Sequence, residues 1–237
     1  DLRAIFGGCV MLNFPVDEKI AEELINKFCE QNRRLLDVVA APSFTPEAVA
    51  ILSRKKGKCR LLANPAIEKA GFSSLDVRKR FRYVRGGFLT QPNYTFLPAM
   101  APTTEGVPES ILKDVILAWA IGCTSNSNTI TIVKEGRLYG NGVGQQDRVG
   151  AAKLAIFRAD DAALFGQGLK SASGEIKADL ENAVAYSDSF FPFPDAPEVL
   201  INRGIKTIFS TSGSVNDEKI INFCKAKNVN LVMLPDS

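Results

Sequence analysis

Residues 35–63 read LLDVVAAPSFTPEAVAILSRKKGKCRLLA and predict a strand, a helix and a second strand in succession. Residues 35–40 are typical of a short, mostly apolar strand. Thr45 is followed by proline and glutamate, which predicts a helix N-cap with proline at the first helical position, so a helix is expected to about Lys56. Residues 60–63 are strand-like again. This alternation of strand and helix favours an α/β sheet.

The alternation extends upstream and then lapses. The apolar run 4–12 predicts a further strand, and Asp17 can cap the helix that follows it. Residues 68–108 lose the pattern, and we interpret them as a connection between two subdomains, 1–104 and 105–237. The basic residues at 78–85 could hold an anion, although a solvated face is the simpler interpretation.

The second half of the chain returns to the α/β pattern. Helices are predicted at 109–121, at about 147–164, around 198–203 and to about 227, and strands at 129–133, 183–187, 207–209 and 229–234. The tetrapeptide KEGR at 134–137 predicts a hairpin turn. Ser214 and Asp217 match a capping box in which aspartate stands for glutamate.

Composition excludes several classes of function. The chain has 237 residues and no histidine, which excludes Ser-His-Asp triads and imidazole zinc sites within this chain. Its five cysteines lack any C-x-x-C pair, so we expect reduced thiols and a cytoplasmic protein. The 29 basic and 26 acidic residues are scattered, and no run of about 18 apolar residues occurs. We therefore expect neither nucleic acid nor a membrane as a partner.

Three loops could carry chemistry. Residues 140–148, GNGVGQQDR, place glycines between a strand and a helix, where backbone N–H groups can meet an anion and Arg148 can clamp it. Residues 187–195, SDSFFPFPD, offer a rigid aromatic wall between Asp188 and Asp195. Residues 210–214, STSGS, offer hydroxyls and N–H groups. Each loop also has a purely structural interpretation as a tight turn, a packed turn or a helix cap.

Taken together and in order, these segments resemble the AICAR transformylase family, the formyltransferase part of the bifunctional enzyme that also carries IMP cyclohydrolase. The resemblance rests on SNT (127–129), GVGQQDR (142–148), SDSFFPFPD (187–195) and TSGSVNDEKI (211–220). The first half adds AIFGG (4–8), APSFTPEAVAIL (41–52) and RGGFLTQ (85–91). The similarity therefore covers nearly the whole chain.

The resemblance implies a fold, an activity and a set of partners. The fold would be a tandem pair of cytidine-deaminase-like, three-layer α/β subdomains used without zinc. The activity would be transfer of the formyl group of 10-formyltetrahydrofolate to AICAR, giving FAICAR in purine biosynthesis. AICAR and the folate cosubstrate would be the small-molecule partners. The active site would lie at a homodimer interface.

The same resemblance assigns roles to individual residues. The AICAR pocket would include Phe6 and Gly7, and Asn128 would hold the reacting carboxamide region as the catalytic residue. Arg148 would contact the nucleotide and Phe193 would stack on a ring. The folate would face Asp195 and Ser214. A monovalent cation, K⁺ in this family, would be held by Asp188, Ser127 and Thr129.

The chain also departs from the family pattern. The family's proton-transfer pair lies in a Lys-His-x-Asn-Pro-Cys-Gly segment upstream of the motif matched here by residues 4–8, and these 237 residues contain no such segment. The C-terminal Arg-x-Phe-x-His tail is also absent, Asp147 replaces a serine and Pro194 an arginine. Loss of a general base typically costs about 10²–10⁴-fold in rate.

Two further hypotheses therefore accompany the formyltransferase. A catalytically silent nucleotide- or folate-binding or scaffolding module of the same fold would keep the pocket without turnover. An unrelated α/β hydrolase or kinase-like enzyme lacks support, because the chain has no nucleophile elbow, Walker motif or triad. Any cyclohydrolase activity would belong to a domain outside this chain.

Overall fold

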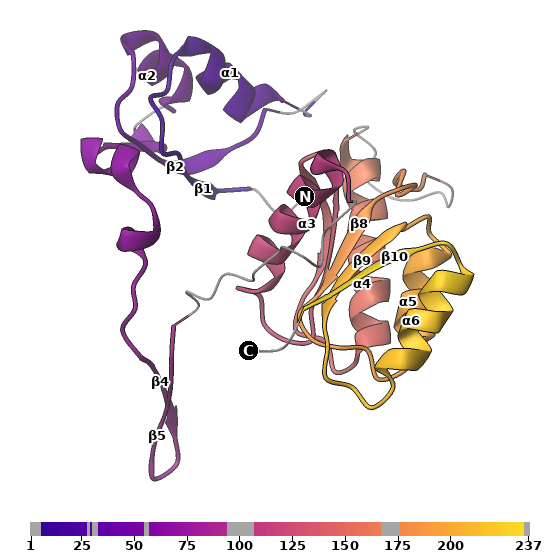
Figure 1. The fold of residues 1–237 in the computed structure, drawn as a ribbon. Helices are drawn as coiled ribbons and strands as arrows, with labels where there is room; N and C mark the ends of the chain where they lie inside the picture. Colours follow the sequence, from indigo (N-terminus) through magenta and orange to yellow (C-terminus); the bar gives the residue numbers. More distant parts are fainter. Residues whose placement is uncertain are drawn as a thin grey trace. The chain divides into compact units, whose positions relative to one another are not determined.

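The computed structural model describes residues 6–27, 29, 33–54, 57–93, 107–166 and 176–234 (Figure 1). The chain divides into two compact units. One comprises residues 2–95 with 165–170, and the other comprises residue 1, 96–164 and 171–237. No helix in these described ranges is long and apolar enough to cross a membrane.

The unit of residues 2–95 contains the strand–helix alternation predicted from the sequence. Its parallel sheet has the order β1-β2-β3. The elements are β1 (Gly8–Met11), α1 (Glu18–Asn26), β2 (Leu36–Ala41), α2 (Pro46–Leu52) and β3 (Arg60–Ala63). Both predicted caps form: Asp17 Oδ1 accepts the Ile20 N–H at 2.9 Å, and Thr45 Oγ1 accepts the Ala48 N–H at 3.2 Å. Helix α2 ends at Leu52 rather than near Lys56 because Ser53 has an extended backbone.

One face of this sheet carries the core. Val39, Ala48 and Leu52 are buried in a cluster that both helices share, which places α1 and α2 on the same face. On the other face Met11 is 70% exposed and Leu62 is 56% exposed. Two layers are therefore seen in the described part of this unit, whereas the sequence interpretation expected three.

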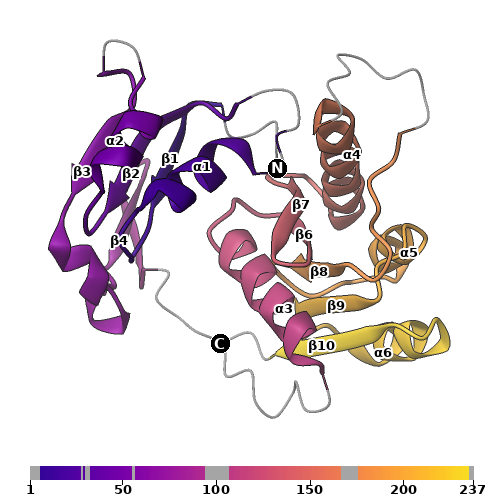
Figure 2. The ribbon, with the colours of Figure 1, turned by 90° about the horizontal axis from the view of Figure 1, so that it is seen from above.

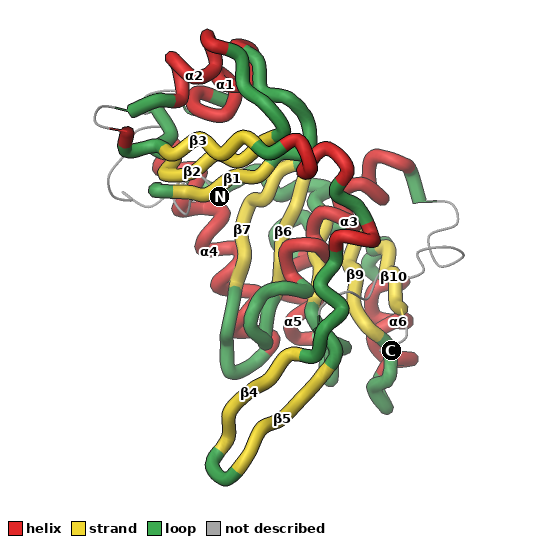
Figure 3. Tube along the Cα trace, turned by 90° about the vertical axis from the view of Figure 1, so that its left-hand side faces the viewer, coloured by secondary structure: helices red, strands yellow, loops and turns green. Residues whose placement is uncertain are grey.

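Residues 80–91 form a hairpin that the sequence analysis missed when it treated 68–108 as a connection. Strands β4 (Arg80–Val84) and β5 (Gly87–Gln91) pair antiparallel around Arg85 and Gly86, and Figure 3 shows them side by side. Two short 3₁₀ helices precede them, η2 (Pro65–Lys69) and η3 (Phe72–Ser74). The signal was present, since aromatic and β-branched residues flank a two-residue loop with glycine at its second position.

The unit of residues 96–237 has three layers. Its mixed sheet has the order β10-β9-β8-β6-β7, with β6 antiparallel to both of its neighbours and β8, β9 and β10 parallel. The strands are β6 (Ile130–Lys134), β7 (Arg137–Gly142), β8 (Val184–Ser187), β9 (Thr207–Thr211) and β10 (Asn230–Leu234). The helices are α3 (Glu109–Gly122), α4 (Arg148–Gly166), α5 (Asp195–Ile201) and α6 (Asp217–Ala226). Helix α3 covers one face, and α4, α5 and α6 cover the other (Figure 2).

Helix α4 packs directly on the backbone of β7. A Cβ atom on Gly140 would lie 2.0 Å from the Ala155 carbonyl oxygen, and one on Gly142 would lie 2.1 Å from that of Ala151. Such distances are far inside van der Waals contact, so only glycine fits at these two strand positions. Alanines on the facing side of α4 complete this close approach.

A buried carboxylate accepts hydrogen bonds from the predicted turn between β6 and β7. Glu135 and Gly136 both have positive φ, as a two-residue hairpin turn requires. Asp114 of α3, only 6% exposed, accepts the N–H groups of Glu135 at 2.7 Å and Gly136 at 2.6 Å. Helix α3 is thus tied to the hairpin by two charge-assisted hydrogen bonds.

Replacing that carboxylate tests the tie. Asp114→Ala removes both hydrogen bonds and is expected to lower the free energy of unfolding by about 1.5–3 kcal/mol, measured by urea denaturation. Glu109→Ala on the same helix is the control, because Glu109 makes an exposed pair with Lys113 that is worth less than about 1 kcal/mol. Equal effects of the two substitutions would contradict a special role for Asp114.

Candidate functional site

The loops singled out by the sequence meet at one edge of the mixed sheet. This edge is the start of β6 and, because β6 runs antiparallel to its neighbours, also the end of β7 and β8. The end of β9 lies at the same edge, since β8 and β9 are parallel. Crevices outside strand ends are a usual place for ligands in α/β sheets.

Asp188, directly after β8, is the hub of this edge. Its Oδ1 accepts the Thr129 N–H at 3.0 Å and a guanidinium N–H of Arg148 at 2.5 Å. The Asp188 N–H in turn donates to the Thr129 carbonyl at 3.2 Å. The side chains of Arg148 and Asp188 are only 12% and 10% exposed. The first residue of α4 is therefore held to the end of β8 by a nearly buried ion pair.

Arg148 also contacts residues 187–195, which we call the aromatic loop. Its Nε donates to the Phe190 carbonyl at 3.1 Å, so two of its nitrogens already have protein partners. The sequence interpretation placed Arg148 on a nucleotide. In the structure its described partners are Asp188 and Phe190, and a nucleotide contact stays a prediction.

Asn128 joins the loop before β6 to the loop after β7. Asn128 and Gln145 exchange backbone hydrogen bonds of 3.1 Å each, and the Asn128 side-chain amide donates to the Gln145 carbonyl at 2.8 Å. One turn back, the Asn126 carbonyl accepts the Gly144 N–H at 2.8 Å and the Thr129 hydroxyl at 2.6 Å. Ser127, between them, is exposed, and its peptide bond with Asn128 is cis.

These bonds favour the tight-turn interpretation for part of residues 140–148. Gly140 and Gly142 lie in β7, where they make room for α4, and only Gly144 lies in the turn. The N–H groups of Gly144 and Gln145 are donated to backbone carbonyls. These two donors are therefore used to hold the turn, and an anion contact by the rest of the loop stays a prediction.

Asp147 acts as a helix cap. Its Oδ1 accepts the Gly150 N–H at 2.7 Å, and its carbonyl accepts the Ala151 N–H. Serine and aspartate are comparable N-cap residues. The replacement of the family's serine by Asp147 therefore preserves the start of α4 and does not by itself favour a silent module.

The aromatic loop lies beside residues 210–214, which we call the serine loop, at the same edge of the sheet. Phe191 is buried, Phe193 is 59% exposed, and Asp195 is exposed with Oδ1 accepting the neighbouring Ala196 N–H. The Asn216 side-chain amide donates to the Pro192 carbonyl at 2.8 Å, which brings the two loops together. An exposed ring beside a carboxylate is available for contact with a flat ligand.

The predicted capping box at Ser214 forms only in part. The Asp217 carboxylate accepts the N–H groups of Gly213 at 2.7 Å and Ser214 at 3.2 Å, as in a capping box. The Ser214 hydroxyl accepts from Asn216 instead of Asp217. The N–H groups of Gly213 and Ser214 are thus directed at Asp217, and the half-buried Ser214 hydroxyl also caps the local backbone.

The remaining predicted residues, Phe6 and Gly7, belong to the unit of residues 2–95. Phe6 is 82% exposed, and Gly7 has a φ of +74°. An added Cβ on Gly7 would lie 3.0 Å from an Asp37 carboxylate oxygen. Sequence reasoning missed the bridging roles of Asn126, Gln145 and Asn216, because amide side chains and carbonyls carry no distinctive spacing.

Two of the cysteines, Cys59 and Cys224, are buried. All five cysteines are free. Burial raises the pKa of the Cys224 thiol to about 11, so this buried thiol is protonated at neutral pH. Within the described ranges, no group of three or more metal-ligating acidic or cysteine side chains comes together.

The fold and this edge together define an α/β protein whose candidate site is built from polar loops at strand ends. The family model described as "AICARFT/IMPCHase bienzyme" matches residues 1–158, and the chain belongs to this family.

Curated relatives extend the match to almost the whole chain. The "Bifunctional purine biosynthesis protein PurH" of Cutibacterium acnes is 34% identical over 238 residues, which is 98% of this chain and 40% of that protein. The protein of the same name from Anoxybacillus flavithermus is 34% identical over 241 residues, 99% of this chain and 40% of that protein. The chain thus spans about two fifths of the length of these relatives.

A solved structure was also matched. "Acinetobacter baumannii RibD, form 2" aligns with 52% of this chain and 35% of its own at 17% identity, with a TM-score of 0.31. This similarity is too low to bear on the fold or the function.

The capping role of Asp147 can be measured directly. Asp147→Ser keeps an N-cap acceptor and is expected to change the free energy of unfolding by less than about 0.5 kcal/mol, whereas Asp147→Ala loses the cap and costs about 1 kcal/mol. Thermal or urea unfolding of both variants decides between a cap and a specific carboxylate role. A serine variant as unstable as the alanine variant would contradict the cap.

Proposed function

We propose that this chain provides formyl transfer from 10-formyltetrahydrofolate to AICAR, giving FAICAR. The observation that carries the proposal is that loops 126–129, 142–148 and 187–195, which bear the family motifs, interlock through Asp188, Arg148 and Asn128 in a member of this family. Because the chain spans only part of its relatives, their activity supports this proposal without establishing it. Cyclohydrolase activity would require residues beyond these 237.

The residue roles follow the family resemblance, with limits that the geometry sets. Asn128 would hold the carboxamide region of AICAR through its side-chain oxygen or its second amide N–H, since one amide N–H is donated to Gln145. Arg148 would reach the nucleotide with the guanidinium N–H groups that Asp188 and Phe190 do not engage. Phe193, exposed at the edge, would stack on a ring.

The folate would face Asp195 and Ser214. Asp195 is exposed, and its carboxylate makes one described hydrogen bond, to its own neighbour's N–H. This leaves acceptor capacity for N–H groups of a heteroaromatic ring. The resemblance also assigns Phe6 and Gly7 to AICAR binding.

In the reaction the AICAR amine attacks the formyl carbon, the bond from that carbon to the folate nitrogen breaks, and a proton moves from the amine to the departing nitrogen. The residues described here would bind and orient the two reactants. Orientation alone can supply a large part of a barrier reduction. Proton transfer belongs, in the family resemblance, to the Lys-His segment that these 237 residues lack.

A monovalent cation is part of the same proposal. Asp188, with Ser127 and Thr129, would hold it, and it would supply a fixed positive charge beside the loops. The Asp188 oxygen not engaged by Thr129 and Arg148 is the acceptor that remains for it. A zinc-free, cytidine-deaminase-like fold for both subdomains, divided as 1–104 and 105–237, is proposed with it.

We also propose a homodimer in the cytoplasm. Hairpin β4–β5 supports a protein contact because Phe81, Tyr83 and Phe88 are 66–74% exposed and stack edge to face on one another. A two-stranded hairpin is marginally stable alone, and an exposed aromatic cluster of this kind marks an interaction surface. Five free cysteines favour a reducing compartment.

A silent binding or scaffolding module is the second candidate. It is the outcome expected if no positioned base acts on the bound amine, because AICAR's amine is a poor nucleophile. Asp147 does not favour it, since this residue keeps the helix cap.

Ligand binding and turnover separate the two candidates. Tetrahydrofolate formation from AICAR and 10-formyltetrahydrofolate is followed, and AICAR affinity is measured by calorimetry. Turnover supports the formyltransferase, AICAR binding without turnover supports the silent module, and absence of both overturns both. Phe193→Ala is expected to lower kcat/KM, or affinity in the silent case, by about tenfold through lost stacking.

Phe157→Ala is the matched control for Phe193→Ala. Phe157 is 61% exposed on α4, so its truncation costs as little stability as that of Phe193 and has no assigned ligand contact. Kinetics or affinity that respond equally to both substitutions would remove Phe193 from the site.

A further inference from the structure

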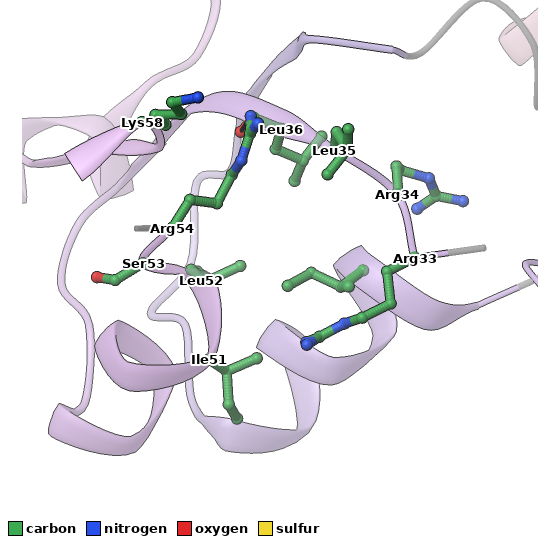
Figure 4. Close-up of a pocket in the computed structure, with 10 residues that line it drawn as sticks. Arg33, Arg34, Leu35, Leu36, Ile51, Leu52, Ser53, Arg54 and Lys58 are labelled. Atoms are coloured by element: carbon green, nitrogen blue, oxygen red, sulfur yellow. Dashed lines mark hydrogen bonds between the residues drawn. The ribbon is translucent and has the colours of Figure 1, made fainter. Parts of the chain in front are cut away.

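A cavity of about 590 Å³ lies in the unit of residues 2–95, where α1 and α2 end and β2 begins (Figure 4). Its apolar floor is made by Ile25, Leu36 and Leu52, which are 7%, 3% and 2% exposed. Sites for small organic ligands commonly have volumes of about 300–1,000 Å³. The cavity is therefore large enough for a small organic molecule with an apolar part.

Four cations line this cavity, and we call the cavity with them the basic groove: Arg33, Arg34, Arg54 and Lys58. A smaller hollow next to it shares Arg54 and Lys58 and adds Asp37. Asp37 is the carboxylate that pairs with Arg54, at 2.9 Å. The charges of the groove lining and its neighbouring carboxylate therefore sum to a clear positive excess.

Two of the four cations, Arg34 and Arg54, already donate hydrogen bonds to other residues of the protein. Arg34 donates to the Leu24 carbonyl at 2.7 Å and to the Lys27 carbonyl at 2.9 Å, which offsets the negative end of α1. Its Nε is buried and has no partner among the described residues. Arg54 donates to Asp37 and, at 3.3 Å, to the Leu36 carbonyl.

Arg33 and Lys58 differ from these two residues in having no such partners among the described residues. Both are exposed, and the described residues offer neither of them an ion pair or hydrogen bond. In Figure 4 Arg33 points toward the floor of the cavity, whereas Arg34 points away from it. A guanidinium directed over apolar side chains, without a carboxylate partner, is suited to an anionic group on a ligand.

We propose that the basic groove binds an organic phosphate monoester, with the phosphate on Arg33 and Lys58 and an aromatic or apolar remainder on the floor of Ile25, Leu36 and Leu52. Guanidinium and ammonium groups are the usual phosphate partners in proteins. The apolar floor favours an organic phosphate over a fully hydrated inorganic ion, because it can pack against the organic part. None of these residues has a role in the proposed formyl transfer, so the inference goes beyond that function.

Calorimetric titration with phenyl phosphate tests the groove, because this probe joins a phosphate monoester to one aromatic ring. In low-salt buffer, Arg33→Ala combined with Lys58→Ala is expected to weaken phenyl phosphate binding about tenfold or more. Lys153→Ala combined with Arg158→Ala is the matched control. It removes the same two residue types from exposed positions on α4 and should leave the affinity unchanged.

The proposal is overturned by no measurable binding, by equal losses in the groove variant and the control, or by binding of phenol as tight as that of phenyl phosphate. Tighter binding of triglutamate than of phenyl phosphate would also overturn it, since the groove would then be a carboxylate site. The titration contains neither AICAR nor folate, so its outcome is independent of formyl transfer.

Discussion

The nearly buried ion pair between Asp188 and Arg148 is the constraint on which the candidate site depends. Asp188 joins the end of β8 to the start of β6 through Thr129, and Arg148 adds the start of α4 and the aromatic loop. Two charges at this depth persist only when paired and hydrogen-bonded. Separating the two side chains would leave each charge buried without a partner. The pair therefore holds the loops before β6, before α4 and after β8 in one arrangement.

That arrangement in turn requires α4 to lie close against β7. The two glycines of β7 allow the Ala151 and Ala155 carbonyls to approach the strand backbone, and this places Arg148, at the helix start, within reach of Asp188. Glycines that resemble a ligand loop in sequence thus serve packing. The site is positioned by a helix seated on a strand rather than by a flexible cradle.

Local signals predicted much of the fold, and tertiary contacts decided the rest. Asp17 and Thr45 cap helices as expected, because capping depends on neighbours in sequence. The motif residues Asn128, Thr129, Arg148 and Asp188 do come together. The ion pair between Arg148 and Asp188 could not be predicted, and neither could the hydrogen bonds from the β6–β7 turn to Asp114. Each of these contacts joins residues more than 20 positions apart in the sequence.

A double-mutant cycle on Arg148 and Asp188 tests the central claim most directly. With urea unfolding as the measurement, Arg148→Met and Asp188→Asn are each expected to cost about 3 kcal/mol, because each strands a buried partner. The double variant should cost about as much as either single one, which gives a coupling energy of about 3 kcal/mol. Additive losses would show that the two residues act separately, and would contradict an edge organised by this pair.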